Sequence, residues 1–126
     1  MIVADSSTWI AFFAGASGKD VRILDHALAD WQVVMAPAVL TELLSDSKLP
    51  TAIGRTLVEV PLLEIRPGYW ERAGALRAKV LAKKRRARLG DVLIAQSCVD
   101  HGMSLVTRDH DFLAFAEDAG LELVAG

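Results

Sequence analysis

Ile2-Val3-Ala4-Asp5-Ser6-Ser7-Thr8 is the stretch that decides the fold. Its first three residues are apolar and two of them are β-branched, which predicts a short buried strand that stops at the polar cluster starting with Asp5. Residues 9–13 are expected to form the helix that follows. A buried strand that leads directly into a helix is typical of a parallel sheet with helices on both faces.

The same alternation of short strands and helices continues along the chain. Further strands are expected at residues 33–36, 62–65, 104–107 and 121–124. Helices are expected around residues 21–28, 37–47, 69–86, 90–99 and 109–118, with another starting at Pro50. Residues 1–126 show no linker or repeat, so the expected fold is one α/β domain. It would be a three-layer α/β/α sandwich around a central parallel sheet of four to five short strands.

The composition excludes several classes of protein. The chain has 126 residues, 52% of them hydrophobic, and a single cysteine, so it needs no disulfide or structural metal to hold a core. Its apolar stretches are far shorter than the ~20 residues that span a bilayer, and its first residues lack the basic start of a signal peptide. We therefore expect a cytoplasmic protein that does not enter a membrane.

Acidic residues are expected at the carboxyl ends of the strands, where open parallel sheets form their binding sites. Asp5 follows the first strand, Glu42 lies one turn into the helix after the second, and Asp109 closely follows the strand at 104–107. Asp91 lies in the first turn of a helix, and Asp111 comes two residues after Asp109. Taken singly, each acid has a structural explanation as a helix cap, a first-turn acid or part of a solvated face.

Together these acids are harder to explain by stability, because carboxylates crowded at one end of a sheet repel one another. A bound cation would relieve the repulsion. Hard carboxylate oxygens suit Mg²⁺ or Mn²⁺, which keep several waters and leave room for substrate phosphates. The cluster therefore points to hydrolysis of phosphodiester bonds by a metal-activated water.

Four blocks of sequence carry a family resemblance that covers nearly the whole chain: Asp5-Ser6-Ser7-x-x-Ile10, Leu40-Thr41-Glu42-Leu43-Leu44, Asp91-x-x-Ile94-Ala95 and Thr107-Arg108-Asp109-x-Asp111-Phe112. In this order they resemble the PIN-domain nucleases, and the length and spacing look like the VapC-type toxins of toxin–antitoxin pairs. The resemblance implies a PIN-like α/β fold and a Mg²⁺-dependent endoribonuclease, with Mn²⁺ able to substitute. Trp9 departs from the pattern, since aliphatic residues are more usual there, and its packing is left open.

The resemblance also implies site residues and partners. The catalytic quartet would be Asp5, Glu42, Asp91 and Asp109, of which Asp5 and Asp91 would hold the metal most directly. Ser6 and Thr107 would be nearby polar supports, and Asp111 would be an outer acid or a helix cap. The implied partners are RNA, a VapB-type antitoxin in a hetero-oligomer, and a second copy of the chain, with the apolar helices near residues 9–13 and 39–57 as the dimer surface.

A basic segment supplies a candidate surface for RNA. Residues 72–90 contain eight basic residues and no acid, although the formal charge of the whole chain is −2. Three of them, Lys79, Lys83 and Arg86, recur at helical spacing, and Lys84, Arg85 and Arg88 widen the face that would contact phosphates. The alternative is a solvated helix end whose charges complement the helix dipole. Tyr69 and Trp70 are expected in the core or a protein interface.

Three other functions stay open on the sequence alone. A PIN nuclease could process RNA without an antitoxin, or a catalytically inactive PIN scaffold could bind RNA or protein. A phosphoacceptor receiver domain would also have parallel α/β architecture with acids. That class resembles this chain less, because the first strand ends in the single acid Asp5 and Arg108 stands where a lysine would be expected after a late strand.

Overall fold

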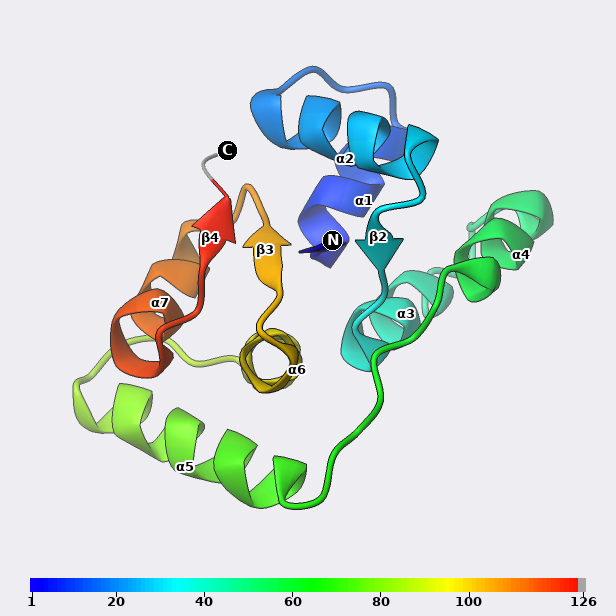
Figure 1. The fold of residues 1–126 in the computed structure, drawn as a ribbon. Coiled ribbons are helices and arrows are strands. Elements are labelled where there is room, and N and C mark those ends of the chain that lie inside the picture. Colours follow the sequence, from blue (N-terminus) through cyan, green and yellow to red (C-terminus); the bar gives the residue numbers. More distant parts are fainter. Residues whose placement is uncertain (125–126) are drawn as a thin grey trace.

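The computed structural model describes residues 1–124 and contains one four-stranded parallel sheet. The strands are β1 (Ile2–Ala4), β2 (Val33–Val34), β3 (Ser104–Val106) and β4 (Leu123–Val124), in the order β2-β1-β3-β4 (Figure 1). Val3 of β1 pairs with Val34 on one side and Leu105 on the other. The first and third strands are therefore central neighbours, although about 100 residues separate them in the sequence.

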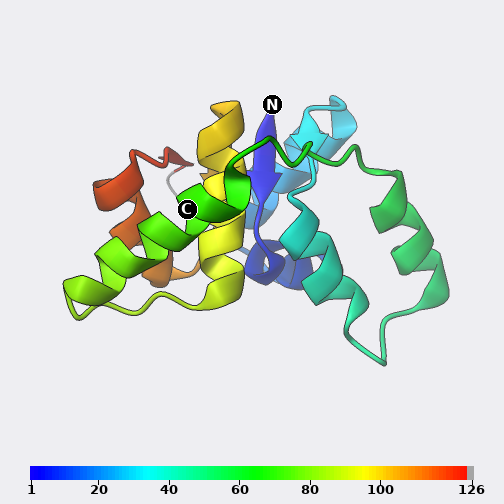
Figure 2. The ribbon, with the colours of Figure 1, turned by 90° about the horizontal axis from the view of Figure 1, so that it is seen from below.

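Helices cover both faces of this sheet. Their bounds are α1 (Ser6–Phe13), α2 (Lys19–Ala29), α3 (Pro37–Leu44), α4 (Thr51–Glu59), α5 (Tyr69–Ala82), α6 (Leu89–His101) and α7 (Leu113–Ala119), with a 3₁₀ turn η1 (His110–Phe112) before the last. In Figure 1, α2 lies on one side of the sheet and α6 on the other, with α5 packed outside α6. Figure 2 shows α4 standing beside α3, away from the sheet. The predicted α/β/α sandwich is confirmed.

The core explains why short apolar runs suffice for the strands. Val3, Leu105 and Val106 are fully buried between the helical layers, as parallel strands covered on both faces require. Trp9, the departure noted in the sequence, is only 1% exposed and its ring stacks on Phe13 with 5.8 Å between centroids. A bulky aromatic residue is thus accommodated in the core.

Other predictions about apolar residues have mixed outcomes. Cys98 is fully buried among core residues, as expected of a small apolar side chain. Tyr69 is buried and its hydroxyl donates to the Leu93 carbonyl at 2.6 Å. Trp70 is 62% exposed and so lies outside the core. Within residues 1–124 no helix has the length and apolar character that crossing a bilayer requires.

The strand predicted at residues 62–65 is wrong. Only one bridge forms there, between Met35 and Leu62, although the Leu63 amide also donates to the Met35 carbonyl at 2.9 Å. Glu64 and Ile65 are exposed, and pairing does not extend to them because the chain after β2 enters α3 at Pro37, which leaves them no neighbouring strand. The segment instead caps the outer edge of β2.

Several predicted helix ends also differ from the structure. The helix expected over 69–86 ends at Ala82, because Lys84 has a left-handed φ of 58°. The helix expected to reach residue 47 ends at Leu44. As a result, Lys79 is in α5 but Arg86 lies beyond its end, and the basic residues do not form one helical face.

Candidate functional site

The sheet brings two of the predicted acids to its carboxyl edge. Asp5 directly follows β1 and Asp109 comes three residues after the end of β3, and these strands are paired through Ala4 and Val106. Asp91 lies in the first turn of α6 and Glu42 lies on α3. All four predicted acids therefore face the same end of the sheet from separate elements, with Asp5 buried and Glu42 exposed.

Asp5 is fixed by a dense set of hydrogen bonds. It caps α1, where its Oδ1 accepts from the Thr8 amide at 3.1 Å, and the Ser7 hydroxyl donates to its two oxygens at 2.8 and 3.0 Å. The Thr107 hydroxyl donates to Oδ2 at 2.6 Å. Burial raises the pKa of Asp5, and the hydrogen bonds from Thr107, Ser7 and Thr8 oppose that rise by stabilising the carboxylate.

Thr107 connects the two central strands at this point. Besides donating to Asp5, its hydroxyl oxygen accepts from the Asp109 amide at 2.9 Å. The side chain predicted to be a polar support is therefore placed between two predicted catalytic acids. One hydroxyl holds both in position.

Three carboxylates converge beside Asp5. One oxygen from each of Asp91, Asp109 and Asp111 lies within 4.8 Å of the others. The desolvation of Asp91 raises its pKa to about 6, and the negative charges of Asp109 and Glu42 add to the rise. The positive charge of nearby Arg88 works in the opposite direction.

The structure shows how Asp111 relates to the two roles considered for it. Asp109, not Asp111, caps the η1 turn, since its Oδ1 accepts from the Asp111 amide at 2.9 Å. The Asp111 carboxylate joins the cluster, and its other neighbour is Arg86, 3.6 Å from Oδ2. Asp5 is not one of these three, and its oxygens accept from Thr107, Ser7 and Thr8.

Glu42 reaches the cluster from the opposite side. Its Oε1 accepts from the Ser6 hydroxyl at 2.7 Å, and its Oε2 lies against Gly90, where an added Cβ would approach to 3.1 Å. Ser6 thus supports Glu42, whereas the sequence placed it only near the site. Gly90 was missed altogether, and its role becomes visible only when α3 and α6 pack together.

Gly90→Ala tests this close approach. Glycine is about 1 kcal/mol less favourable than alanine in a helix. Replacing Gly90 in the first turn of α6 by alanine should therefore leave the free energy of unfolding level or raise it. The methyl would also push the Glu42 carboxylate aside, and nuclease activity should fall about tenfold. Thermal unfolding and RNA cleavage measured on the same preparation check both parts. A variant with full activity would show that the position of Glu42 is unimportant.

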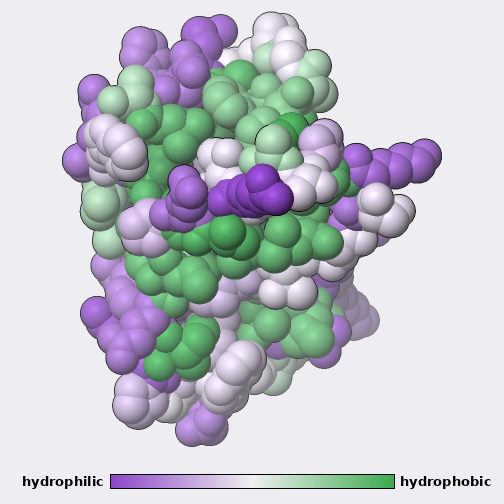
Figure 3. Space-filling view, turned by 90° about the vertical axis from the view of Figure 1, so that its right-hand side faces the viewer, coloured by the Kyte–Doolittle hydropathy of each residue, from purple (hydrophilic) through white to green (hydrophobic). Residues whose placement is uncertain are grey.

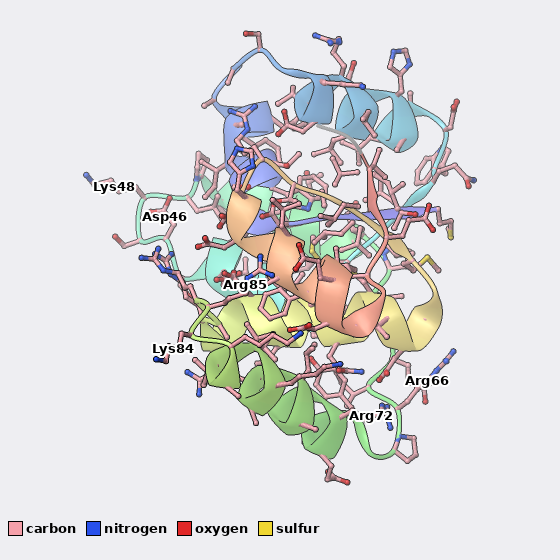
Figure 4. All side chains as sticks on the ribbon, turned by 90° about the vertical axis from the view of Figure 1, so that its left-hand side faces the viewer. Asp46, Lys48, Arg66, Arg72, Lys84 and Arg85 are labelled. Atoms are coloured by element: carbon pink, nitrogen blue, oxygen red, sulfur yellow. The ribbon has the colours of Figure 1, made fainter. Side chains whose placement is uncertain are left out.

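The basic segment divides into two groups. Lys79 donates to the carbonyl of Asp118 at 3.0 Å, Lys83 pairs with the Asp118 carboxylate, and Arg85 pairs with Glu117. These three residues tie the end of α5 to α7. Lys84 and Arg88 form no ion pair within residues 1–124. Lys84 points outward at the end of α5, as Figure 4 shows.

Lys83→Ala should lower the melting temperature by about 5 °C, whereas Lys84→Ala should leave it unchanged. The Asp118 side chain is 2% exposed and one of its oxygens has no partner among the described residues. The hydrogen bond from Lys83 holds the pKa of Asp118 below its ordinary value, which means that Lys83 stabilises the charged carboxylate. Without Lys83 the buried carboxylate loses the cation that pairs with it. Differential scanning fluorimetry of both variants measures the contrast. Equal melting temperatures would show that the α5–α7 ion pairs do not stabilise the fold.

The donor set fits a divalent cation. Hard carboxylate oxygens from Asp91, Asp109 and Asp111, with Glu42 nearby, are the ligands that Mg²⁺ and Mn²⁺ prefer. Their mutual repulsion would be relieved by a positive ion.

A parallel α/β sandwich with such an acidic cluster at its carboxyl edge corresponds to a known family. Residues 2–118 match the family model of the PIN domain, so this chain belongs to the PIN-domain family. This confirms the resemblance carried by the four sequence blocks.

Two relatives that are similar over nearly the whole chain are named as VapC ribonucleases. Ribonuclease VapC11 of Mycobacterium tuberculosis and VapC ribonuclease Mb1587 of Mycobacterium bovis are each 28% identical to this chain over 131 residues, covering 97% of it and 96% of their own length. VapBC-5 of M. tuberculosis has a similar fold, with a TM-score of 0.69, 22% identity, and 99% and 98% of the two chains covered. For VapBC2 of Rickettsia felis the TM-score is 0.72, at 19% identity and 98% coverage of both chains.

Proposed function

We propose that this chain is a divalent-metal-dependent endoribonuclease that acts in the cytoplasm as the toxin of a VapBC-type pair, with residues 1–126 forming one nuclease domain. The observation that carries the proposal is the convergence of Asp91, Asp109 and Asp111 beside Asp5 and Glu42 in a PIN fold. The similar proteins named as VapC ribonucleases support the same activity.

The proposed catalytic residues are Asp5, Glu42, Asp91 and Asp109. Asp91 and Asp109 would hold Mg²⁺ with help from Asp5 or Asp111. When bound, the ion activates a water and neutralises charge on the phosphoryl oxygens. Ser6 holds Glu42 through Oε1, which leaves Oε2 free to accept a proton or orient the attacking water. Thr107 keeps Asp5 and Asp109 at a fixed separation before substrate arrives.

RNA would bind across the part of the basic segment that does not pair with α7. Lys84, Arg86 and Arg88 are exposed. Arg86 lies 3.6 Å from the Asp111 carboxylate, and the positive charge of Arg88 lowers the pKa of Asp91. Contacts of this kind bind phosphates and give affinity without sequence specificity. The other predicted RNA-binding residues, Lys79, Lys83 and Arg85, would contribute less because they already pair with α7.

Lys84→Ala with Arg86→Ala should weaken RNA binding several-fold and reduce its dependence on salt concentration. Lys79→Ala is the matched control, since that residue is basic and exposed but bonded to α7. Filter binding with Asp91→Asn as the background prevents cleavage during the measurement. Unchanged affinity in the double variant would place the RNA elsewhere.

The proposed protein partners are a VapB-type antitoxin and a second copy of the chain. An apolar hollow of about 360 Å³ lies between α3 and α4, lined by Leu44, Leu49, Pro50 and Val58 among others. A neighbouring hollow of about 290 Å³ is lined partly by Ile10 and Phe13 of α1. Figure 3 shows apolar residues gathered in patches on this side of the molecule. The VapBC complexes of similar fold support an antitoxin as one of these partners.

Purified protein incubated with total cellular RNA tests the function. With Mg²⁺ or Mn²⁺ we expect discrete cuts that leave 5′-phosphate and 3′-hydroxyl ends, and no cuts in EDTA or with Asp5→Asn. Sequencing the RNA ends identifies the sites. A folded protein that binds metal but never cuts RNA would contradict the enzyme and favour a non-catalytic PIN scaffold.

A further inference from the structure

We propose that Asp20 and Arg108 are a positioning pair that sets the separation of the Asp5 and Asp109 carboxylates and so the affinity of the site for a divalent cation. Neither residue belongs to the proposed catalytic quartet. The inference rests on the proposed function, because it assigns these residues a role toward the metal of that same site.

The pair is a two-point ion pair between a partly exposed guanidinium and a buried carboxylate. Arg108 Nε donates to Asp20 Oδ2 at 2.8 Å, and Nη2 donates to Oδ1 at 2.9 Å. The side chains are 38% and 4% exposed, respectively. Arg108 Nη2 also donates to the Ser17 carbonyl at 3.2 Å. The end of β3 is therefore fastened to the start of α2.

Asp20 is also connected to the other side of the site. Its Oδ2 accepts from the Thr8 hydroxyl at 3.0 Å, and Thr8 is fully buried. The amide of the same Thr8 donates to Asp5 Oδ1 at 3.1 Å. Fixing Thr8 on Asp20 therefore fixes one of the donors that orient the Asp5 carboxylate.

These hydrogen bonds form a closed path from Asp20 through Thr8, Asp5 and Thr107 and back through Arg108. Arg108 stands between Thr107 and Asp109 in the chain, and Thr107 donates to Asp5. One path from Asp20 thus reaches Asp5 through Thr8, and the other reaches Asp109 through Arg108. A shift of the buried Asp20 carboxylate would change both ends together. Side chains that hydrogen-bond directly to metal ligands commonly tune metal binding by about 10–100-fold, and Asp20 acts one contact further out, through Thr8.

The chain offers a matched comparison pair far from the site. Arg72 binds Asp100 with the same two-point geometry, at 3.0 and 2.6 Å, and the side chains are 43% and 8% exposed. Asp100 is near the carboxyl end of α6, whereas Asp91 is at its start. Figure 4 shows Arg72 at the opposite end of α5 from Lys84 and Arg85. This pair has no hydrogen-bonded path to Asp5 or Asp109 among the described contacts.

Mn²⁺ binding without RNA, measured by calorimetry on the full chain, separates a positioning role from a structural one. Arg108→Gln and Arg72→Gln should lower the melting temperature to a similar extent. Only Arg108→Gln should weaken Mn²⁺ binding, by about tenfold. Arg108→Lys, which keeps the charge but loses the two-point geometry, should recover the melting temperature more fully than the affinity.

Wild-type affinity in Arg108→Gln, or an equal loss in Arg72→Gln, would overturn the inference. If Arg108→Gln does not fold, Asp20→Asn replaces it, with Asp100→Asn as its control and the same two readouts. A wild-type chain that binds no Mn²⁺, or binds it equally well after Asp91→Asn, would overturn the proposed function and this inference with it. Mn²⁺ binding that is lost in Asp91→Asn but unchanged in Arg108→Gln would overturn the inference alone.

Discussion

Asp91→Asn should lower RNA cleavage by about 10³-fold or more and, in the absence of metal, raise the melting temperature. Under the proposed function Asp91 is a direct ligand of the activating ion, and losing such a ligand removes several kcal/mol of transition-state stabilisation. The gain in stability comes first from no longer burying a charged carboxylate and then from removing its repulsion with Asp109 and Glu42, since these causes in that order raise the pKa of Asp91 to about 6. Asparagine has a shape similar to that of aspartate, but it carries no charge, so Asp109 and Glu42 no longer repel the side chain at position 91.

The stability gain should depend on pH in a defined direction. The folded-state pKa of about 6 is higher than the ordinary aspartate value of about 3.9, so the folded protein holds a proton that the unfolded chain releases. The contribution of protonated Asp91 to the free energy of unfolding of the wild type is therefore fully present below about pH 4. It is lost as the pH rises to about 6. The shift corresponds to at most about 3 kcal/mol, and partial exposure of Asp91 reduces this to about 1–2 kcal/mol.

Thermal unfolding in EDTA at pH 4.5 and pH 7.5 checks the prediction. The variant should exceed the wild type by more at pH 7.5 than at pH 4.5. Asp25→Asn, which replaces an exposed acid on α2, is the control and should change neither stability nor cleavage. Full cleavage by Asp91→Asn, or a melting temperature below the wild type at pH 7.5, would contradict the assigned site.

Thr107→Val should also inactivate the enzyme, but with the opposite effect on stability. Valine has nearly the shape of threonine, yet it removes the donor to Asp5 and the acceptor for the Asp109 amide. Leaving buried polar groups without partners costs about 2–3 kcal/mol, which corresponds to a fall on the order of 10 °C in melting temperature. Cleavage should fall about 10–100-fold, because the carboxylates are no longer held together.

Thr107→Ser keeps the hydroxyl and is the matched control. It should retain most of the stability and most of the activity. Thermal unfolding without metal and cleavage with Mg²⁺, measured on both variants, give the two readouts. If valine is tolerated as well as serine, the hydroxyl between Asp5 and Asp109 has no part in organising the site.

The sheet could be predicted from sequence because its strands are buried on both faces. Runs such as Ile2-Val3-Ala4 and Ser104-Leu105-Val106 are apolar and end at polar residues, and both form strands where expected. The run at 62–65 is equally apolar, but only one of its residues joins the ladder. Apolar composition alone therefore does not make a strand, because pairing also needs a neighbouring strand, and the chain after β2 enters α3 at Pro37.

The candidate acids were found because topology places residues after parallel strands together. Their supporting contacts could not be found in this way. Asp20 reads as an ordinary first-turn acid of α2, and its partner Arg108 lies 88 residues away. The pairing of part of the basic segment could not be predicted for a similar reason, since the acids Glu117 and Asp118 that pair with it belong to α7. Charge patterns along a chain do not reveal such tertiary pairs.

The placement of β3 has a consequence for the time course of protein synthesis. Asp5 cannot form its hydrogen bond with Thr107 until Thr107 is translated, 102 residues later. The neighbouring Asp109 is translated after that. At about 5–20 residues per second, a ribosome needs roughly 5–20 s to extend the chain from one to the other. During that interval the β1 segment has no β3 strand to pair with. The acidic cluster is therefore assembled only after Asp109 and Asp111 have been translated.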